Sequence, residues 1–168
     1  RCELPIKFLP KSETDEVRFY YQDEIPSPIG IEPISKLESF NPDIIFFNGL
    51  LAGKNIVWIL EQKKKGVKIV LDVDDYWELS STHPLRDYWY KHGYDILYQR
   101  TIQIADVVFT TNDFLRNKIL PLNKNCVIIP NAVPFGETFF TQDLNVSKLD
   151  KMNFLYSGGS THYKDVLI

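Results

Sequence analysis

The stretch Val67–Val73 (VKIVLDV), followed at once by Asp74 and Asp75, decides the fold of this chain. It is the clearest strand signal in the sequence, because aliphatic and mostly β-branched residues fill it almost continuously. Nearly continuous apolar strands are typical of parallel sheets that are covered on both faces. Open α/β sheets bind their ligands beyond the carboxyl ends of such strands, so the acidic residues mark a candidate site.

Further strand signals lie on both sides of this stretch and alternate with segments of helical spacing. Short runs of aliphatic and aromatic residues predict strands at residues 17–21, 43–47, 107–111 and 126–129. Between them we expect a helix that starts near Gly53, and helices over residues 84–105 and 114–120. Strands that alternate with helices in this way predict an α/β fold with a doubly wound parallel sheet.

The expected helices have recognisable faces and ends. In the first, the apolar face consists of Gly53, Ile56, Val57 and Leu60. Gly66 is suited to cap the carboxyl end of that helix, because glycine adopts the left-handed conformation easily. In the long helix, which has Pro84 near its start, one stripe repeats at steps of four and three: Tyr90, Tyr94, Leu97, Thr101 and Ile104. Asn112 or Asp113 is a candidate N-cap of the last helix.

The composition changes after Pro134, where a second domain is expected to follow. Residues 136–151 are polar and show little periodicity, which is typical of a linker. Residues 153–157 (NFLYS) then form a new strand signal, followed by the turn Gly158-Gly159-Ser160-Thr161 and the start of a helix. We therefore expect one domain over residues 1–135, a linker over residues 136–151 and the first part of a second domain over residues 152–168.

Composition and charge exclude several classes of partner. The 168 residues have a formal net charge of -3, so there is no general basic field and nucleic acid is not an expected partner. The one basic run, Lys63–Lys65, stands where a helix is expected to end, a position that favours cations. Cys2 and Cys126 are too few and too far apart for a disulfide scaffold, which favours reduced thiols and a cytoplasmic location. No apolar run approaches the length of a membrane span.

The acidic cluster Asp72, Asp74 and Asp75 is the sharpest candidate for chemistry. Three carboxylates within four positions repel one another unless hydrogen-bond donors, a cation or protonation relieves them. A raised pKa on one of them would suit proton transfer or the stabilisation of charge. The alternative is that Asp72 makes internal hydrogen bonds while Asp74 and Asp75 only cap the next turn.

Polar residues at the other strand ends and in nearby loops are further candidates. Asn48 and Asn112 follow two of the expected strands, and His83 lies in the aromatic loop after the acidic cluster. A loop histidine is more often simply solvated. The aromatic residues around it can stack on a sugar or a lipid, although packing in the core or at its rim is their commoner role: Tyr76, Trp77, Tyr88, Trp89 and Tyr90.

The glycine turn near the end of the sequence has the features of a phosphate-binding loop. Gly158 and Gly159 allow backbone N–H groups to approach a phosphate, and a helix is expected to begin just after them. Ser160 and Thr161 supply hydroxyl donors, and Lys164 lies one turn further on as a possible counter-charge. A Gly-Gly turn after a strand is also common in proteins that bind no phosphate.

Taken in order, four segments resemble the family 4 glycosyltransferases, which have two facing Rossmann-like domains (the GT-B fold). The segments cover residues 70–77 (VLDVDDYW), 105–111 (ADVVFTT), 127–133 (VIIPNAV) and 154–162 (FLYSGGSTH). The resemblance implies that residues 1–135 form a Rossmann-like acceptor-side domain. Residues 1–9 then correspond to its first helix, with the first strand upstream of Arg1.

The resemblance also implies an activity. It is the retaining transfer of a sugar from a nucleotide-diphosphate-sugar to a glycan, lipid or protein acceptor, with no cofactor or metal and with possible peripheral membrane contact. Asp74 and Asp75 are the implied catalytic residues, and the implied acceptor-side residues are Asn48, Asp72, His83 and Asn112. The donor diphosphate is expected to meet Gly158, Gly159, Ser160, Thr161 and Lys164.

The sequence departs from the family pattern in three places. The acidic pair near the donor sugar would lie beyond Ile168, so residues 1–168 alone are expected to be inactive. Many relatives have a histidine near the strand end where this chain has Asp74 and Asp75, and the arginine expected shortly after the glycine turn is not evident.

Three alternatives remain open at this stage. A phosphohydrolase of the haloacid dehalogenase type would use Asp72 as nucleophile and Asp74 as general acid with magnesium, although Tyr76 stands where those enzymes usually have Thr or Val. A single-domain, metal-dependent glycosyltransferase would use the same two residues as a DxD motif. The third is a non-catalytic Rossmann-like module that binds a nucleotide or a partner protein.

Overall fold

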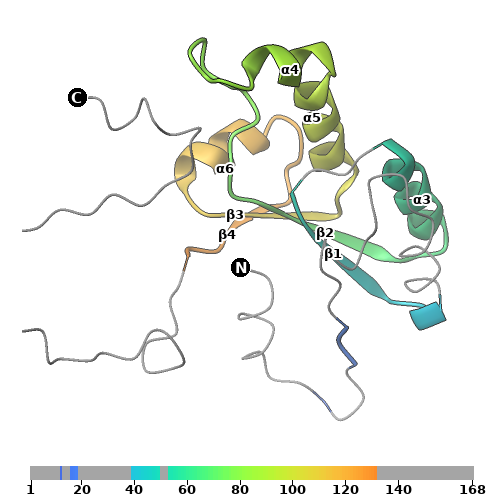
Figure 1. The fold of residues 1–168 in the computed structure, drawn as a ribbon. Coiled ribbons are helices and arrows are strands. Elements are labelled where there is room, and N and C mark those ends of the chain that lie inside the picture. Colours follow the sequence, from blue (N-terminus) through green and yellow to red (C-terminus); the bar gives the residue numbers. More distant parts are fainter. Residues whose placement is uncertain (1–11, 13–15, 19–38, 50–52, 132–168) are drawn as a thin grey trace, which may run out of the picture.

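The computed structural model describes residues 12, 16–18, 39–49 and 53–131, which form an α/β unit around one parallel sheet (Figure 1). Its elements follow in the order β1 (Ile44–Asn48), α3 (Gly53–Lys64), β2 (Lys68–Val73), α4 (Arg86–Lys91), α5 (Tyr94–Ile104), β3 (Val107–Thr110), α6 (Asp113–Ile119) and β4 (Cys126–Ile128). All strand pairs are parallel and the spatial order is β1-β2-β3-β4. The predicted α/β class with a Rossmann-like parallel sheet is confirmed.

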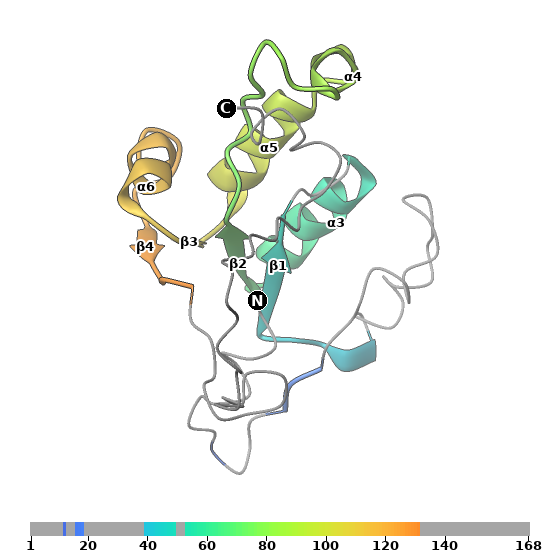
Figure 2. The ribbon, with the colours of Figure 1, turned by 60° about the vertical axis from the view of Figure 1, so that its left-hand side comes forward.

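The helices that connect these strands form one layer. Right-handed crossovers between strands that follow one another in space place each connecting helix on the same face of the sheet. Figures 1 and 2 show α3, α5 and α6 together on that face. The side chains of Ile69, Leu71 and Val73 point towards the helices and are buried, as expected from the alternation along a strand. Among the described residues, no helix covers the opposite face. A doubly wound sheet has helices on both faces, and the described residues form the helical layer on one of them.

Two clusters of buried side chains hold the helices against the sheet. The larger joins β2, β3 and β4 to α5 and α6, with Tyr98, Ile102, Leu115 and Ile119 packed on Leu71 and Val108. The smaller joins α3 to β1 and β2, and Phe47 contacts both clusters. Each fully buried aliphatic side chain contributes about 1.5–3 kcal/mol relative to exposure. The sheet is therefore a rigid platform for the residues at its carboxyl edge.

The predicted apolar face of α3 is wrong in part. Val57 is 59% exposed and Leu60 is also exposed, whereas Trp58 and Ile59 are buried against the sheet, and Ile56 of the predicted face packs beside them. The cause lies in the run Ile56–Leu60, in which all five residues are apolar and two different helix faces are equally hydrophobic. Packing of Trp58 and Ile59 against Ile45 and Ile69 decides between them.

The predicted long helix over residues 84–105 is interrupted, which is a second correction. α4 ends at Lys91, and α5 begins at Tyr94 after Gly93, whose φ of 65° lies in the left-handed region. Glycine reaches that region without strain, so it ends one helix and lets the next start in a new direction. Of the predicted stripe only Thr101 is buried, and the principal core residues of α5 are Tyr98 and Ile102.

The other helix ends agree with the sequence. Gly66 follows α3 with a φ of 97°, and its N–H donates to the carbonyl of Lys63. Asn112 caps α6 by accepting a hydrogen bond from the Leu115 N–H at 3.0 Å. These two residue types act through local backbone geometry, which explains why their positions could be recognised without knowledge of the packing.

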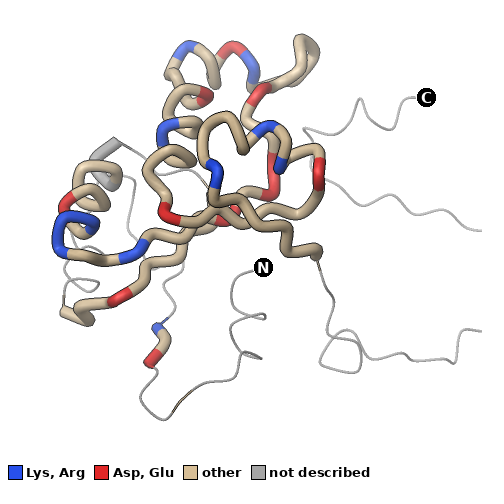
Figure 3. Tube along the Cα trace, turned by 180° about the vertical axis from the view of Figure 1, so that it is seen from behind, with Lys and Arg blue, Asp and Glu red and all other residues tan. Residues whose placement is uncertain are grey.

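At the amino-terminal edge of the sheet, Asp106 joins the start of β3 to β2 and to the end of α3. Its carboxylate accepts a hydrogen bond from the Ile69 N–H (2.8 Å), its own N–H donates to the Ile69 carbonyl (2.8 Å), and Lys63 lies 3.2 Å from its other oxygen. Burial alone would raise the pKa of Asp106, but the Ile69 N–H and the Lys63 ammonium outweigh it and hold the pKa below its ordinary value. Lys63 belongs to the basic run at the end of α3, visible as a blue segment in Figure 3.

Several predictions fall outside the described residues. They are the helix over residues 1–9, most of the strand over residues 17–21, the linker over residues 136–151 and the second-domain start over residues 152–168. The donor-side residues Gly158, Gly159, Ser160, Thr161 and Lys164 are among them.

Candidate functional site

The carboxyl edge of the sheet brings together the polar ends of β1, β2 and β3. In the parallel register Asn48 is the partner of Asp72, and Val73 is the partner of Thr110. Asp74 and Asp75 follow β2 directly, and Asn112 follows β3. Residues from three separate parts of the sequence therefore line one edge, as expected for an open parallel sheet.

Asp72 is held in place by Asn48. The Asn48 side-chain amide donates to a carboxylate oxygen of Asp72 at 3.0 Å, and the Gly49 N–H donates to the Asp72 carbonyl at 3.3 Å. Only 2% of Asp72 is exposed, although it carries a carboxylate. A buried carboxylate requires such donors, because an unpaired one would lose its hydration without compensation. Asp72 is therefore suited to hold the edge in shape rather than to contact a ligand.

Asp74 and Asp75 differ from Asp72 because both are exposed to solvent. Their position relative to α5 is revealed by Tyr98, which is buried and stacks on Trp77 with ring centroids 6.0 Å apart. Burial first, and then the negative charges of Asp74, Asp75 and Asp72, raise the pKa of the Tyr98 phenol well above its ordinary value. The three carboxylates thus lie within electrostatic reach of one phenol, at the boundary between core and solvent.

Tyr98 was not among the predicted site residues. The expected stripe of the long helix included Tyr94 and Thr101 but left out Tyr98 and Ile102, because the interruption at Gly93 was not anticipated. The available signal is the i, i+4 spacing of Tyr94, Tyr98 and Ile102. In α5, which starts directly after Gly93, Tyr98 and Ile102 are buried and Tyr94 is half-buried.

Two of the predicted acceptor-side residues are engaged in local structure. Besides capping α6, the Asn112 amide donates to the Thr111 hydroxyl at 2.9 Å. The His83 Nδ1 accepts a hydrogen bond from the Leu85 N–H at 3.1 Å, which shapes the turn before α4. Both residues therefore have structural roles that need no ligand.

The loop after Asp75 is fastened to α4 by aromatic side chains. The Trp89 indole N–H donates to the Trp77 carbonyl at 2.9 Å, and the Tyr90 hydroxyl accepts from the Leu79 N–H at 3.2 Å. The Trp77 ring itself is buried between this loop and α5. Most of the aromatic residues in this loop and in α4 thus anchor the loop, so the exposed carboxylates stand on an ordered support.

One group of side chains beside the acidic edge remains open to solvent. Tyr76 follows Asp75, and its ring meets the Phe114 ring of α6 edge to face at 5.6 Å. The Lys118 ammonium lies 5.2 Å from the Tyr76 ring centroid and 5.8 Å from that of Phe114. Phe114 is 58% exposed despite its size. This group was not predicted as a unit, because Tyr76 and Phe114 are distant in sequence.

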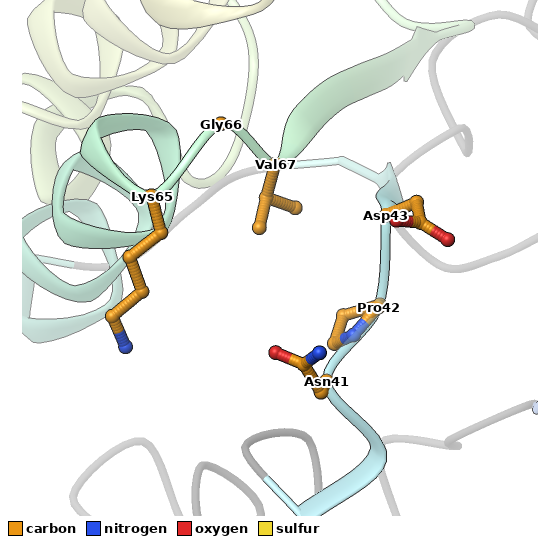
Figure 4. A pocket seen from close by; sticks show the side chains of 6 residues that line it. All are labelled: Asn41, Pro42, Asp43, Lys65, Gly66 and Val67. Atoms are coloured by element: carbon orange, nitrogen blue, oxygen red, sulfur yellow. The ribbon is translucent and has the colours of Figure 1, made fainter.

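A shallow pocket lies at the other edge of the sheet. It has a volume of about 150 Å³ and is lined by Asn41, Pro42, Asp43, Lys65, Gly66 and Val67, the residues that lead into β1 and β2. Figure 4 shows the Asn41 amide turned into this hollow and the Asp43 carboxylate turned away from it. Parallel α/β sheets bind their ligands at the opposite edge, so we interpret the hollow as a surface depression between two loops.

Within residues 39–49 and 53–131, no three His, Cys, Asp or Glu side chains are placed to hold a metal ion. In the same ranges, none of the helices has both the length and the apolar character needed to cross a bilayer.

Comparison of the chain with protein-family models, with curated proteins and with solved structures found no match.

Proposed function

We propose that this chain supplies the acceptor-side domain of a retaining glycosyltransferase that uses a nucleotide-diphosphate-sugar. The observation that carries the proposal is the arrangement of the acidic edge. Asp74 and Asp75 are exposed at the carboxyl end of the central strand, while Asp72 is buried behind them and hydrogen-bonded to Asn48. A pair of accessible carboxylates on a rigid support is suited to a reaction that develops positive charge on a sugar.

The proposed chemistry needs two contributions from this edge. As the bond between the anomeric carbon and the donor phosphate breaks, positive charge builds up on the sugar ring, and nearby carboxylates stabilise it. A new bond forms between that carbon and an acceptor oxygen, whose proton passes to the departing phosphate. An exposed carboxylate can also accept a hydrogen bond from the acceptor hydroxyl and orient it, which lowers the entropic part of the barrier.

The donor side of the proposal rests on the sequence resemblance alone. Gly158, Gly159, Ser160 and Thr161 would meet the diphosphate through backbone N–H groups and hydroxyls, and Lys164 would add a positive charge. The acceptor is a glycan, a lipid or a protein, and a peripheral membrane contact is compatible with the proposal. The free, buried thiol of Cys126 suits the cytoplasmic location that we propose.

The burial of Asp72 argues against the phosphohydrolase alternative. In that mechanism Asp72 would attack a phosphate, and a nucleophile needs an oxygen that the substrate can reach. Here 2% of Asp72 is exposed and one oxygen already accepts from Asn48. The acidic edge therefore favours charge stabilisation by Asp74 and Asp75 over covalent catalysis by Asp72.

The test is a transferase assay on the protein expressed from its complete reading frame. Release of nucleoside diphosphate is measured with a panel of uridine, guanosine and adenosine diphosphate sugars. We expect Asp74→Asn or Asp75→Asn to lower turnover by about 10²–10³-fold, the usual effect of removing a group that stabilises developing charge. Asp87→Asn is the matched control, because Asp87 is fully exposed on α4. Turnover unchanged in both edge variants would remove the pair from the mechanism.

Reading the gene beyond Ile168 gives an independent check. A second α/β domain that carries two glutamates close together in sequence supports sugar transfer. A stop codon directly after Ile168 supports a binding module. Added magnesium or manganese that raises the melting temperature, with reversal by EDTA, would support the metal-dependent alternatives through ligand-linked stabilisation.

A further inference from the structure

The group Tyr76, Phe114 and Lys118, which we call the aromatic platform, borders the acidic edge on the side of α6. Tyr76 follows Asp75 directly, and Phe114 stands two residues after Asn112. The two aromatic residues therefore come shortly after the ends of β2 and β3 in the sequence. Its rings meet at 5.6 Å with an interplanar angle of 78°. The platform therefore extends the candidate site away from the sheet.

The side chains of the aromatic platform contact one another and the core, so their arrangement is fixed by the fold. Tyr76 packs on Trp77 at 5.0 Å and partly against the larger core cluster, so its ring is fixed from below. Lys118 lies over both rings and also close to the Tyr76 hydroxyl, which the Glu78 carboxylate approaches as well. Burial first, and then Glu78, raise the pKa of Tyr76 above its ordinary value, so the hydroxyl stays protonated in more alkaline solution.

Phe114 is a large aromatic residue whose side chain adds little to the core. At 58% exposure it contributes little apolar burial. Tyr88 on α4 is similarly exposed at 56%, but its ring stacks closely with His92 at 4.2 Å. Phe114 thus presents a ring to solvent beside the Lys118 ammonium and the ring of Tyr76.

That combination matches the two-sided chemistry of a saccharide. A pyranose ring has an apolar face of C–H groups, which stacks on an aromatic ring, and an edge of hydroxyls that require hydrogen-bond partners. The platform offers the ring of Phe114 for the face, and Lys118, Glu78 and the Tyr76 hydroxyl for the edge. A lipid chain would use the aromatic ring but would leave the three polar groups without a function.

We propose that the aromatic platform binds a saccharide ring of the acceptor, with the sugar stacked on Phe114 and its hydroxyls bound by Lys118 and Glu78. This inference rests on the proposed function, because it assigns the acceptor to the carbohydrates and places it next to Asp74 and Asp75. Tyr76, whose ring contacts the Phe114 ring, adjoins Asp75 directly in the chain.

The experiment measures binding of simple sugars to the 168-residue chain. Methyl α-D-glucopyranoside, methyl α-D-mannopyranoside and N-acetylglucosamine are titrated separately while the ring signals of ¹³C-labelled phenylalanine are followed by NMR. We expect at least one of them to shift the Phe114 signals, with a dissociation constant of about 1 mM or weaker, as is usual for small ligands on open surfaces. The Phe114→Tyr variant identifies the Phe114 signals by their loss.

Variants separate stacking from general surface effects. Because the Phe114 variants lack the Phe114 signals, their binding is followed by saturation transfer from the protein to the sugar. Phe114→Ala should weaken binding about tenfold or more, the value of one aromatic stack, whereas Phe114→Tyr should retain it because the ring remains. Lys118→Ala should weaken binding without moving the melting temperature. Tyr88→Ala is the matched control, since Tyr88 has nearly the same exposure and lies on α4, and it should bind as the parent chain does.

Each remaining outcome counts against the proposal. It is overturned if none of the three sugars shifts the Phe114 signals, or if Phe114→Ala binds as tightly as the parent chain. Binding to phosphatidylglycerol vesicles that depends on Phe114, without sugar binding, would assign the platform to a lipid instead. Failure of the proposed function is distinguishable, because it would appear as sugar binding at the platform together with no transfer by the protein of the complete reading frame.

Discussion

The Asn48 side chain donates a hydrogen bond of 3.0 Å to the buried carboxylate of Asp72 across the parallel pair β1–β2. This bond joins two residues that are 24 positions apart in sequence, at the point where the site begins. It fixes the end of β2, and the chain turns into the exposed pair Asp74 and Asp75 directly afterwards. The shape of the acidic edge therefore depends on an interaction between strands.

Removal of that donor should destabilise the chain. In Asn48→Ala the Asp72 carboxylate stays buried but has lost a hydrogen-bond donor, which costs about 1–3 kcal/mol. Urea denaturation followed by circular dichroism measures the free energy of unfolding. Asn117→Ala, at an exposed position in α6, serves as the control and should change stability by less than about 0.5 kcal/mol. Equal free energies of unfolding for the two variants would show that the Asn48–Asp72 hydrogen bond does not stabilise the fold.

Asp106 should make the stability of the fold depend on acid. The pKa of its carboxyl lies below the ordinary value of 3.8, because the Ile69 N–H and Lys63 outweigh the effect of burial. A lowered pKa in the folded state means that the stabilisation is fully present above the unfolded value of 3.8 and is lost as the pH falls through the folded pKa. The Asp106→Asn variant loses the ion pair at every pH, and we expect it to be about 1–3 kcal/mol less stable at pH 7.

The pH profile is the decisive measurement for Asp106. The difference in unfolding free energy between the parent chain and Asp106→Asn should be constant from pH 7 to about pH 5 and should shrink below about pH 4. Asp87→Asn, at a fully exposed position on α4, should show no such pH-dependent difference. A difference for Asp106→Asn that persists unchanged at pH 3 would contradict the role of the carboxylate charge.

The parts of the fold that depend on local chemistry were predictable from sequence. The bounds of β2 were expected within one residue, because an apolar run ends at charged residues on one side and at Gly66 on the other. Gly66 and Asn112 were recognised as helix caps for the same reason, since each acts on backbone groups of its own segment. The parallel α/β class followed from the alternation of these local signals.

The parts that depend on contacts between distant segments were not predictable. In α3 the apolar run Ile56–Leu60 permits two buried faces, and only the sheet selects Trp58 and Ile59. The partnership of Asn48 with Asp72 requires the register of β1 and β2. The contact between Tyr76 and Phe114 requires α6 to lie beside the loop after β2. In each case the sequence defined which residues were available, and tertiary packing decided which of them met.

The interruption of the predicted long helix can be tested at Gly93. Its φ of 65° is costly for a residue with a Cβ atom, although no heavy atom lies within 4 Å of where that atom would be. Gly93→Ala should therefore lose about 1–2 kcal/mol through backbone strain alone. Gly93→Asn should lose less, because asparagine tolerates the left-handed conformation. Thermal melting of both variants checks this, and a Gly93→Ala variant as stable as the parent chain would indicate a continuous helix.

The effect of the three carboxylate charges on the pKa of Tyr98 gives the sharpest test of the acidic edge. A difference titration of the parent chain against Tyr98→Phe, followed by phenolate absorbance, should show that Tyr98 ionises well above the ordinary value of 10.0. Because the charges of Asp74 and Asp75 contribute to that shift, the double variant Asp74→Asn, Asp75→Asn should lower the pKa of Tyr98. Burial remains in the double variant, so the pKa should stay above the ordinary value. The double variant Asp87→Asn, Asp95→Asn removes the same two negative charges from α4 and α5, so it is the control and should leave the pKa of Tyr98 unchanged. If the pKa of Tyr98 does not respond to loss of Asp74 and Asp75, these carboxylates lie too far from the phenol to influence it. The acidic edge would then have no electrostatic interaction with the buried side chain of Tyr98.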